Sequence, residues 1–375
     1  MASIYIHIPY CKKQCTYCNF HFRIAQNDKE EMLKSIKKEI EMRQPYLNGA
    51  TISSIYLGGG TPSILNKEEI ESLVNTVYCN FTIDKGTEIT LECNPDDLNA
   101  QMLADLKEIG INRLSIGIQS FDDEDLKFMN RSHNAKEALG CIQLAKKAGF
   151  NNITIDLIYG LPNQSNENWE DNLTQMLALN IQHFSAYALT VEPKTALKHL
   201  IDKKKVTPLD DEITVEHFNT LIAVATENNF IHYEISNFGK EGFFSNHNTA
   251  YWKNQHYLGI GPSAHSFNGT SRQWNIASNK QYIEKVNTNS SYFEIETLTN
   301  AQQYNEYVFT ALRTMWGVDL NYISTQFGIE AQQYFEKQVI NWIKQEKIKQ
   351  QNNNLTLTEK GKLYADAIAS DLFIV

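Results

Sequence analysis

Strand-like and helix-like segments alternate through the first half of this chain, and the alternation limits the folds open to it. Each short run of β-branched and aromatic residues is followed by a longer run with apolar residues every three or four positions. Such units give parallel strands joined by right-handed crossovers. Six units are fewer than a closed barrel needs, which predicts an α/β fold built on a partial (β/α)6 barrel. The expected strands are Ser3–Ile8, Ile52–Leu57, Glu88–Glu92, Arg113–Gly117, Ile153–Ile158 and His183–Leu189.

Helices are expected between these strands, and one of them carries a clear start signal. Asn66 precedes a helix over 67–78, with Glu69 at its third position, which predicts a capping box. Beyond the sixth strand, a helix at 212–227 and a strand at 231–235 lead into a loop-rich stretch that ends near residue 267. The other helices between strands are expected at 28–45, 98–109, 135–148 and 168–179.

The pattern changes after about residue 295. Helices at 301–315 and 330–346 are followed by a hairpin around 352–354 and a last helix at 358–372. This order predicts a small winged-helix-like α+β domain at the C-terminus. The predicted domains are therefore residues 1–290 and 295–375.

Three cysteines follow the first strand in the spacing CxxxCxxC. Cys11, Cys15 and Cys18 could hold a four-iron cluster and leave one iron without a protein ligand. They could equally bind zinc, with His7 or His21 as the fourth ligand. On the cysteines alone both readings stay open, whereas a disulfide would leave an odd cysteine in the triplet. The remaining three, Cys79, Cys93 and Cys141, are expected to be ordinary small core residues.

A glycine-rich turn follows the second strand, and it favours the cluster. The run Gly58-Gly59-Gly60-Thr61-Pro62 lets backbone groups approach a polar ligand without interference from Cβ atoms. Alone it is a weak signal, because any tight strand–helix turn favours glycine. Together with CxxxCxxC it resembles the radical S-adenosylmethionine (SAM) superfamily. That resemblance implies a [4Fe-4S] cluster on the three cysteines, with SAM bound at its open iron.

Longer motifs narrow the resemblance to one branch of that superfamily. The runs Tyr5–Cys11, Leu91–Pro95, Ser115–Phe121, Asn130-Arg131 and Asp156–Pro162 look like those of the oxygen-independent coproporphyrinogen III oxidases and the heme chaperones related to them. The likeness covers most of residues 3–270, and the C-terminal region fits the small extra domain of this group. By the resemblance, the SAM pocket would be lined by Tyr5, Tyr17, Gly59, Gly60, Thr61, Glu92, Gln119, Arg131, Asp156 and Ala188.

The two kinds of relative differ in function, and three features favour the chaperone. The oxidase pattern has a fourth cysteine two residues after the third, where this chain has Phe20. The segment that precedes the cluster motif in the oxidases is missing here. The run that contains His247, Tyr251 and Trp252 matches the HNxxYW motif that the chaperones associate with heme. A histidine can ligate heme iron, and Tyr and Trp offer flat faces to a porphyrin.

The motif could instead have a purely structural role, with a loop histidine beside two core aromatics. From the residues alone, this structural role is favoured over heme binding. With Phe20 and the short N-terminus, the resemblance favours heme. His265 is a weaker candidate for a second ligand. We therefore expect a radical SAM-type protein that binds heme and delivers it to hemoproteins. The alternatives are a coproporphyrinogen III oxidase, which would decarboxylate propionates through a SAM-derived radical, and another radical SAM modification enzyme. No catalytic residue is assigned.

The formal net charge of −10 argues against a large nucleic-acid surface, because phosphate binding needs clustered Lys and Arg. No signal peptide and no span of about 20 apolar residues is evident, which predicts a cytoplasmic protein. The expected partners are heme and recipient hemoproteins. Membrane respiratory enzymes among them would bring the protein to a membrane through its partners. By resemblance, the chain would be a monomer or a cluster- or heme-dependent dimer.

Overall fold

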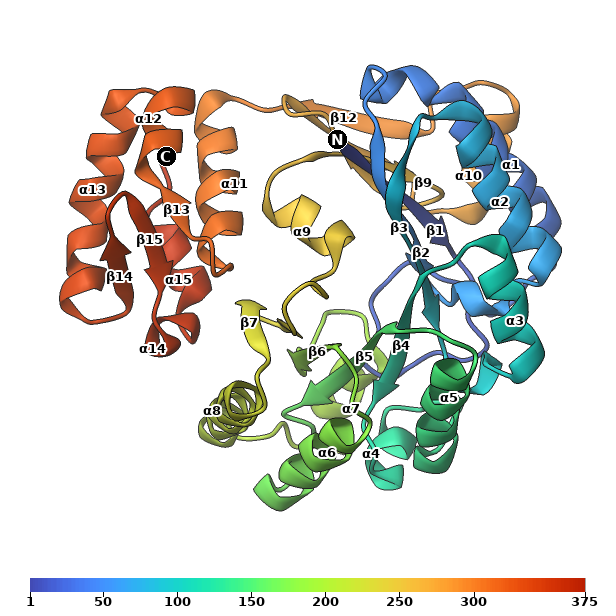
Figure 1. The fold of residues 1–375 in the computed structure, drawn as a ribbon, viewed down its shortest axis with the longest axis horizontal. Helices are drawn as coiled ribbons and strands as arrows, with labels where there is room; N and C mark the ends of the chain where they lie inside the picture. Colours follow the sequence, from blue (N-terminus) through green and yellow to red (C-terminus); the bar gives the residue numbers. More distant parts are fainter. Residues whose placement is uncertain (375) are drawn as a thin grey trace.

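The computed structural model describes residues 1–374 and confirms the α/β fold. Its centre is a run of six neighbouring parallel strands. Helices cover the outer face of this curved sheet (Figure 1). The strands are β1 (Ala2–Ile8), β2 (Ile52–Gly59), β3 (Ile83–Cys93), β4 (Arg113–Gln119), β5 (Asn152–Tyr159) and β6 (His183–Ala188). The helices are α1 (Lys29–Met42), α2 (Lys67–Asn80), α3 (Ala100–Ile109), α4 (Asp123–Phe128), α5 (Ala135–Lys147), α6 (Asn166–Ala178) and α8 (Asp211–Glu227).

Local sequence signals explain where these elements begin and which face they bury. The predicted capping box at α2 is present, with the Asn66 side chain accepting from the Glu69 backbone N–H. The same helix buries Ile70, Leu73, Val74 and Val77, the spacing of one helical face. Strands β1 and β2 are buried almost throughout, as expected for parallel strands covered on both sides.

The sheet extends on both sides of the six strands and does not close. Beyond β1 lies β9 (His256–Ile260), which is parallel to β1. The antiparallel strands β10 (His265–Phe267), β11 (Ser271–Asn275) and β12 (Phe293–Thr297) continue from it. Beyond β6 lie β8 (Asn237–Gly239) and β7 (Ile231–Glu234). The twelve strands thus form one open sheet with β12 and β7 at its edges.

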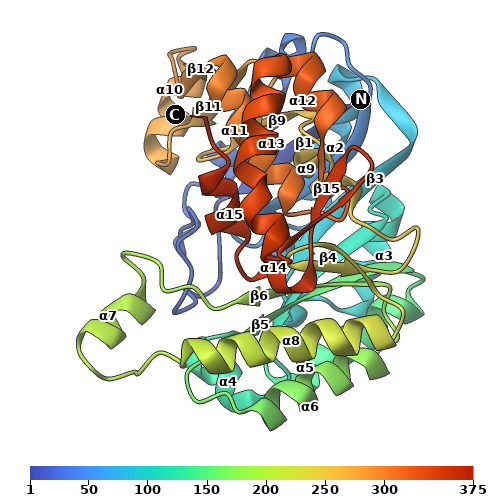
Figure 2. The same cartoon turned by 90° about the vertical axis from the view of Figure 1, so that its left-hand side faces the viewer.

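The expected loop-rich stretch up to residue 267 was wrong. It contains β8, β9, β10 and the short helix α9 (Asn246–Trp252). Their lengths of three to seven residues give too little periodicity to be recognised. Strand β9 forms because it pairs with β1, more than 200 positions earlier in the chain. The sequence also did not predict α4, α7 (Ala196–Asp202), which projects from the body (Figure 2), α10 (Asn279–Asn287) or the helix at Leu320–Phe327 in the C-terminal region.

The C-terminal region packs around its own apolar core, which includes Val308, Ile323, Phe335 and Ile368. It lies at one end of the molecule, with α9 between it and the central sheet (Figure 1). The expected last helix at 358–372 is broken near Leu363, because α14 ends and α15 begins there. The elements are α11 (Asn300–Leu312), β13 (Val318–Asp319), α12 (Leu320–Phe327), α13 (Ile329–Lys344), β14 (Ile348–Gln351), β15 (Asn354–Leu357), α14 (Glu359–Lys362) and α15 (Ala365–Asp371).

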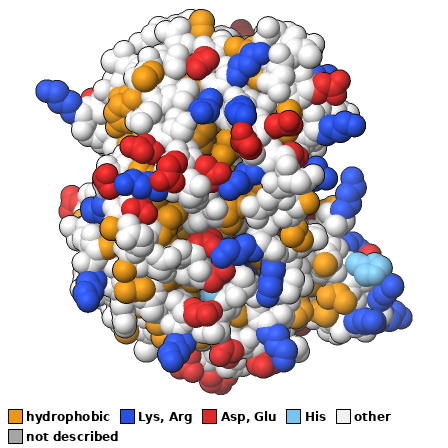
Figure 3. Space-filling view, turned by 90° about the vertical axis from the view of Figure 1, so that its right-hand side faces the viewer, with side chains coloured by type: hydrophobic (Ala, Val, Ile, Leu, Met, Phe, Trp, Pro, Cys, Tyr) orange, Lys and Arg blue, Asp and Glu red, His pale blue; other side chains and the backbone are white. Residues whose placement is uncertain are grey.

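The surface over the outer helices α1, α2 and α3 mixes acidic and basic side chains without a large field of one sign (Figure 3). Among residues 1–374, no helix combines the length and the apolar character needed to cross a bilayer. Three short 3-10 turns complete the fold, at Gln44–Leu47, Pro62–Ile64 and Pro95–Asp97.

Candidate functional site

The three cysteines lie on the loop that follows β1, at the carboxyl edge of the sheet. Cys11, Cys15 and Cys18 are partly exposed free thiols that line one cavity. The loop is held in place from both ends, because Cys11 N–H donates to the Arg23 carbonyl at 3.0 Å and Thr16 N–H donates to the Met129 carbonyl at 3.1 Å. Burial raises the pKa of the Cys11 thiol to about 11, so iron binding would have to displace its proton.

The geometry does not favour the zinc alternative. His7 uses both ring nitrogens, with Nε2 2.8 Å from the His21 carbonyl and Nδ1 3.2 Å from the Tyr5 hydroxyl. His21 Nε2 is 2.7 Å from Asn279 Oδ1. Over residues 1–374, no three His, Cys, Asp or Glu side chains gather closely enough to hold a single ion. Thiolates around a four-iron cluster bind separate irons and stand farther apart, so this donor set suits a cluster better.

The glycine loop after β2 packs directly against the cysteine loop. Gly60 N–H donates to the Ile8 carbonyl at 2.9 Å and Thr61 N–H donates to the Tyr10 carbonyl at 2.7 Å. A Cβ atom on Gly60 would lie 2.5 Å from the Tyr10 carbonyl oxygen, so only glycine fits this close approach. The Thr61 hydroxyl reaches Cys11 Sγ at 3.4 Å. The two motifs, forty residues apart in sequence, therefore form one continuous wall.

Two carboxyl groups face the same cavity from the ends of β3 and β5. Glu92 accepts from the Tyr56 hydroxyl at 2.8 Å and from Gly59 N–H at 3.1 Å. Burial raises the pKa of Glu92 to about 7 and that of Asp156 to about 6. Carboxyl groups with raised pKa values in a cavity are typical of a binding or catalytic site.

Arg131 brings a half-buried positive charge to the cysteine loop. Its Nη1 donates to Cys15 Sγ at 3.2 Å, and its Nη2 donates to Asn94 Oδ1 and to the Gly117 carbonyl, both at 2.8 Å. The sequence analysis quoted Asn94 within a motif but assigned it no role; its place after β3, beside Glu92, was the available signal. Gln119, at the end of β4, has a left-handed backbone with φ 70°, which costs energy for a non-glycine residue and is common at functional sites.

Most of the residues expected around SAM do share one cavity, of about 470 Å³. Tyr5 is the exception, because it lies in a neighbouring cavity with its hydroxyl 3.2 Å from His7 Nδ1. Of the three remaining cysteines, Cys93 and Cys141 are buried as expected, whereas Cys79 is exposed, so its core prediction was wrong. The expected residues that line the first cavity are Cys11, Cys15, Tyr17, Cys18, Gly59, Gly60, Thr61, Glu92, Gln119, Arg131, Asp156 and Ala188.

The second cavity, of about 640 Å³, adjoins the first. The two share Asn19, Phe20, Glu92 and Tyr187 in their walls. Aromatic and histidine side chains dominate the remainder of the second cavity, which lies between β1, α9 and the turn before β10. Its size lies within the range of about 300–1,000 Å³ that is usual for small-molecule and cofactor sites.

The HNxxYW residues of helix α9 lie in two different environments, the second cavity and the junction with the C-terminal region. His247 is 2% exposed, with Nδ1 2.9 Å from Ser54 Oγ and Nε2 3.1 Å from the Tyr251 hydroxyl. Burial lowers the pKa of His247 to about 3, and its ring stacks on Tyr56 at 4.8 Å. Trp252 does not line the cavity and lies under the Arg313 guanidinium, at the junction with the C-terminal region. Both ring nitrogens of the expected heme ligand are therefore already engaged.

Comparisons with known proteins identify the superfamily to which this chain is similar. The radical SAM superfamily model matches residues 5–176 and the HemN C-terminal domain model matches residues 298–364. The superfamily implies a [4Fe-4S] cluster and SAM. The solved coproporphyrinogen III oxidase (HemN) of Escherichia coli has a similar structure, with a TM-score of 0.87 and 25% identity over 99% of this chain and 90% of that one.

The curated relatives are more specific. The heme chaperone HemW of Bacillus subtilis is 32% identical over 98% of this chain and 98% of its own length. The heme chaperone HemW of Lactococcus lactis is 30% identical over 96% of this chain and 94% of its own length. Because both likenesses run from the cysteine loop to the C-terminal region, the chain belongs to the HemW family of the radical SAM superfamily.

Proposed function

We propose that this protein binds heme and passes it to hemoproteins, while it keeps a [4Fe-4S] cluster and a SAM site. The observation that carries the proposal is Phe20. It stands where the oxidase pattern has its fourth cysteine, its side chain is 70% exposed, and it lies in the walls of both cavities. Phe20 is a large exposed aromatic residue between the cluster site and a cavity lined by aromatic side chains. This arrangement suits a flat apolar ligand.

The residues around the first cavity fit the cofactors that the superfamily implies. Cys11, Cys15 and Cys18 would hold the cluster, which when bound supplies an electron and an open iron for the amino and carboxyl groups of SAM. The Gly59–Gly60 backbone would lie along the methionine part of SAM. Arg131 would hold a carboxylate by charge-assisted hydrogen bonds, because its guanidinium already points at the cysteine loop. Glu92 and Asp156 would accept from ribose hydroxyls or the SAM ammonium.

The second cavity is the proposed place for heme. His247 and Tyr251 form part of its wall, and Trp252 would act through the position of α9 and the C-terminal region. In this proposal residues 1–290 form the partial barrel with the α9 extension, and residues 295–375 form the small C-terminal domain. Six free thiols and an oxygen-sensitive open iron suit a reducing compartment, so we place the protein in the cytoplasm. Recipients would be hemoproteins, and membrane respiratory enzymes are included among them.

The alternative function is the oxidase reaction, decarboxylation of propionate side chains through a SAM-derived radical. The overall likeness to the E. coli oxidase favours it, and the two cavities would then hold SAM and porphyrinogen. The missing fourth cysteine argues against it. Heme uptake and coproporphyrinogen III turnover separate the two functions directly.

The test uses full-length protein reconstituted with iron and sulfide under anaerobic conditions. We expect hemin to produce a Soret band, the loaded protein to transfer heme to an apo-hemoprotein, and coproporphyrinogen III to stay unchanged with SAM and reductant. Cys18→Ser should reduce the cluster absorbance, whereas Cys79→Ser, at an exposed cysteine outside both cavities, should leave it intact. Turnover of coproporphyrinogen III without hemin binding would show that the protein is an oxidase.

A further inference from the structure

We propose that His265, rather than His247, is the axial ligand of the heme iron, at the mouth of the second cavity, with Phe20 and Tyr187 against the porphyrin faces. This inference rests on the proposed heme-binding function. It concerns which of this chain's histidines can reach the iron, and it follows from the hydrogen bonds of the histidines around the cavity.

Four histidines line the second cavity, and they differ in the nitrogens they have free. His7 and His247 each have both ring nitrogens hydrogen-bonded inside the protein. His21 has Nε2 held by Asn279 at 2.7 Å. Within residues 1–374, neither ring nitrogen of His265 has a hydrogen-bond partner, and its side chain is exposed at the cavity mouth. Metal ligation needs an accessible imidazole nitrogen, which His265 offers without breaking a buried bond.

The backbone holds His265 in a fixed position. It begins β10, directly opposite Trp274 on β11. Just before it, Ala264 N–H donates to the Gly261 carbonyl at 3.2 Å, and the Ala264 carbonyl accepts from Asn275 N–H at 2.9 Å. The ring of His265 lies 6.4 Å from the Trp274 ring, at an interplanar angle of 30°. A ligand on a paired strand is positioned more firmly than one on a free loop.

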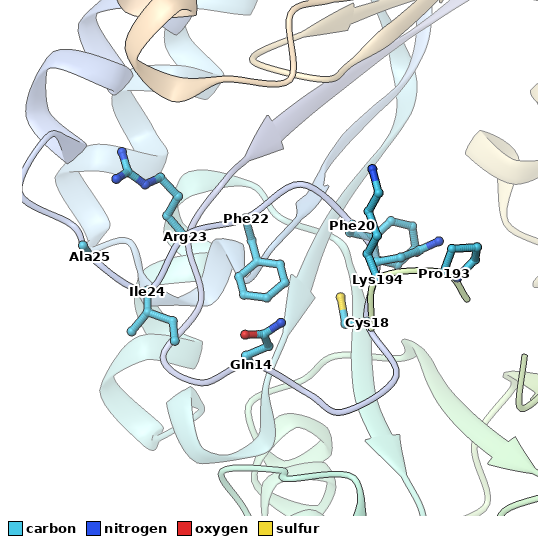
Figure 4. A pocket seen from close by; sticks show the side chains of 10 residues that line it. Gln14, Cys18, Phe20, Phe22, Arg23, Ile24, Ala25, Pro193 and Lys194 are labelled. Carbon is cyan, nitrogen blue, oxygen red and sulfur yellow. The ribbon is translucent and has the colours of Figure 1, made fainter. Parts of the chain in front are cut away.

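Two exposed aromatic side chains flank the cavity on the side of the cysteine loop. Phe20 is 70% exposed and Tyr187 is 43% exposed, and both belong to the walls of both cavities. On its outer side Phe20 shares a groove with Cys18, Pro193 and Lys194 (Figure 4). Covering these rings with a porphyrin would remove apolar surface from water. Phe20 is two residues from Cys18, so the cysteine loop itself supplies part of the wall of the second cavity.

The protonation state of His265 suits this role. Partial burial, together with the nearby Arg272 guanidinium, lowers the pKa of His265. This shift favours the neutral imidazole, which is the form that binds iron.

The test is titration of the full-length chain with hemin, followed by absorption and EPR spectra. We expect His265→Ala to raise the Kd for hemin on the order of tenfold and to remove the signature of histidine ligation. Added imidazole should restore that signature in His265→Gly. His256→Ala, at an exposed strand histidine outside both cavities, is the matched control and should behave as wild type.

The outcomes separate this inference from the function it rests on. Wild-type spectra in His265→Ala, or loss of ligation in His247→Ala or His21→Ala alone, would overturn the assignment of His265 and leave heme binding in place. A wild-type chain that binds no hemin would overturn the proposed function itself. A thermal melt of each variant shows whether a lost signal comes from the ligand or from the fold.

Discussion

Arg131 Nη1 lies 3.2 Å from Cys15 Sγ, so a residue of the loop that follows α4 places a half-buried positive charge against the cysteine loop that follows β1. The same guanidinium ties together Asn94 and the Gly117 carbonyl, each at 2.8 Å. One side chain thus connects the ends of β1, β3 and β4. Its charge balances thiolates when the cysteines ionise, and its side chain lines the cavity proposed for SAM.

Replacing this guanidinium should weaken SAM binding. Arg131→Met removes a charge-assisted hydrogen bond worth about 2 kcal/mol, so we expect the Kd for SAM to rise more than tenfold in anaerobically reconstituted protein. Equilibrium dialysis with SAM measures it. Arg23→Met is the matched control, because Arg23 lies on the cysteine loop with a half-exposed side chain paired to Asp28. Equal SAM affinity in the two variants would contradict the role given to Arg131.

The contact between the two loops should make Gly60 sensitive to one added carbon. A Cβ atom there would lie 2.5 Å from the Tyr10 carbonyl oxygen, so Gly60→Ala should lower the free energy of unfolding by about 1–3 kcal/mol. Gly140, within α5, has open space around the same position, and Gly140→Ala should raise stability by about 0.5–1 kcal/mol. Urea unfolding measures both, and a Gly60→Ala variant as stable as Gly140→Ala would refute the close packing of the loops.

The affinity for SAM should depend on pH through Glu92. Its pKa is raised to about 7 by burial, so the carboxyl group is largely neutral below that pH. A neutral carboxyl accepts hydrogen bonds less well than a carboxylate, so the affinity should rise with pH up to about 7, by at most about tenfold per pH unit, and then level off. The Glu92→Gln variant has no such ionisation and should show a flatter profile. Dialysis between pH 6 and pH 8 distinguishes the two curves.

Stability should fall on the acid side because several buried histidines are held neutral. Burial lowers the pKa of His133 to about 4 and those of His232 and His247 to about 3. Between these values and the unfolded pKa of about 6.5, the unfolded chain binds more protons, so unfolding becomes easier as the pH falls. In that pH window, each such histidine lowers the free energy of unfolding by about 1.4 kcal/mol for each unit by which the pH falls.

Urea midpoints at pH 7, 6 and 5 test this acid dependence. His247→Gln should be less stable than wild type at pH 7, because Ser54 and Tyr251 lose their bonding partner. Its stability should nevertheless fall less steeply toward pH 5, since one titrating group is gone. An identical slope in the two proteins would show that His247 does not remain neutral in the fold.

The sequence by itself determined the central sheet and the first cavity. Alternating strand and helix patterns predicted all six parallel strands, because buried parallel strands and amphipathic helices leave local periodic signals. The capping box of Asn66 and Glu69 was predicted because it is complete within four residues. The cysteine spacing and the glycine turn were enough to predict a shared site, since parallel strands bring their carboxyl ends to one edge.

Only the tertiary structure decided what surrounds that site. Strand β9 forms because it pairs with β1, and its five residues carry no local signal that predicts this pairing. The sequence motif made His247 the expected heme ligand, but Ser54, 193 positions away, occupies one of its nitrogens. The exposure of Phe20 and the free nitrogens of His265 likewise depend on segments that are distant in sequence. Hydrogen-bond partners and exposure are properties of the assembled fold. A local sequence pattern can therefore identify candidate ligands such as His247 and His265, but it cannot show which of them is accessible.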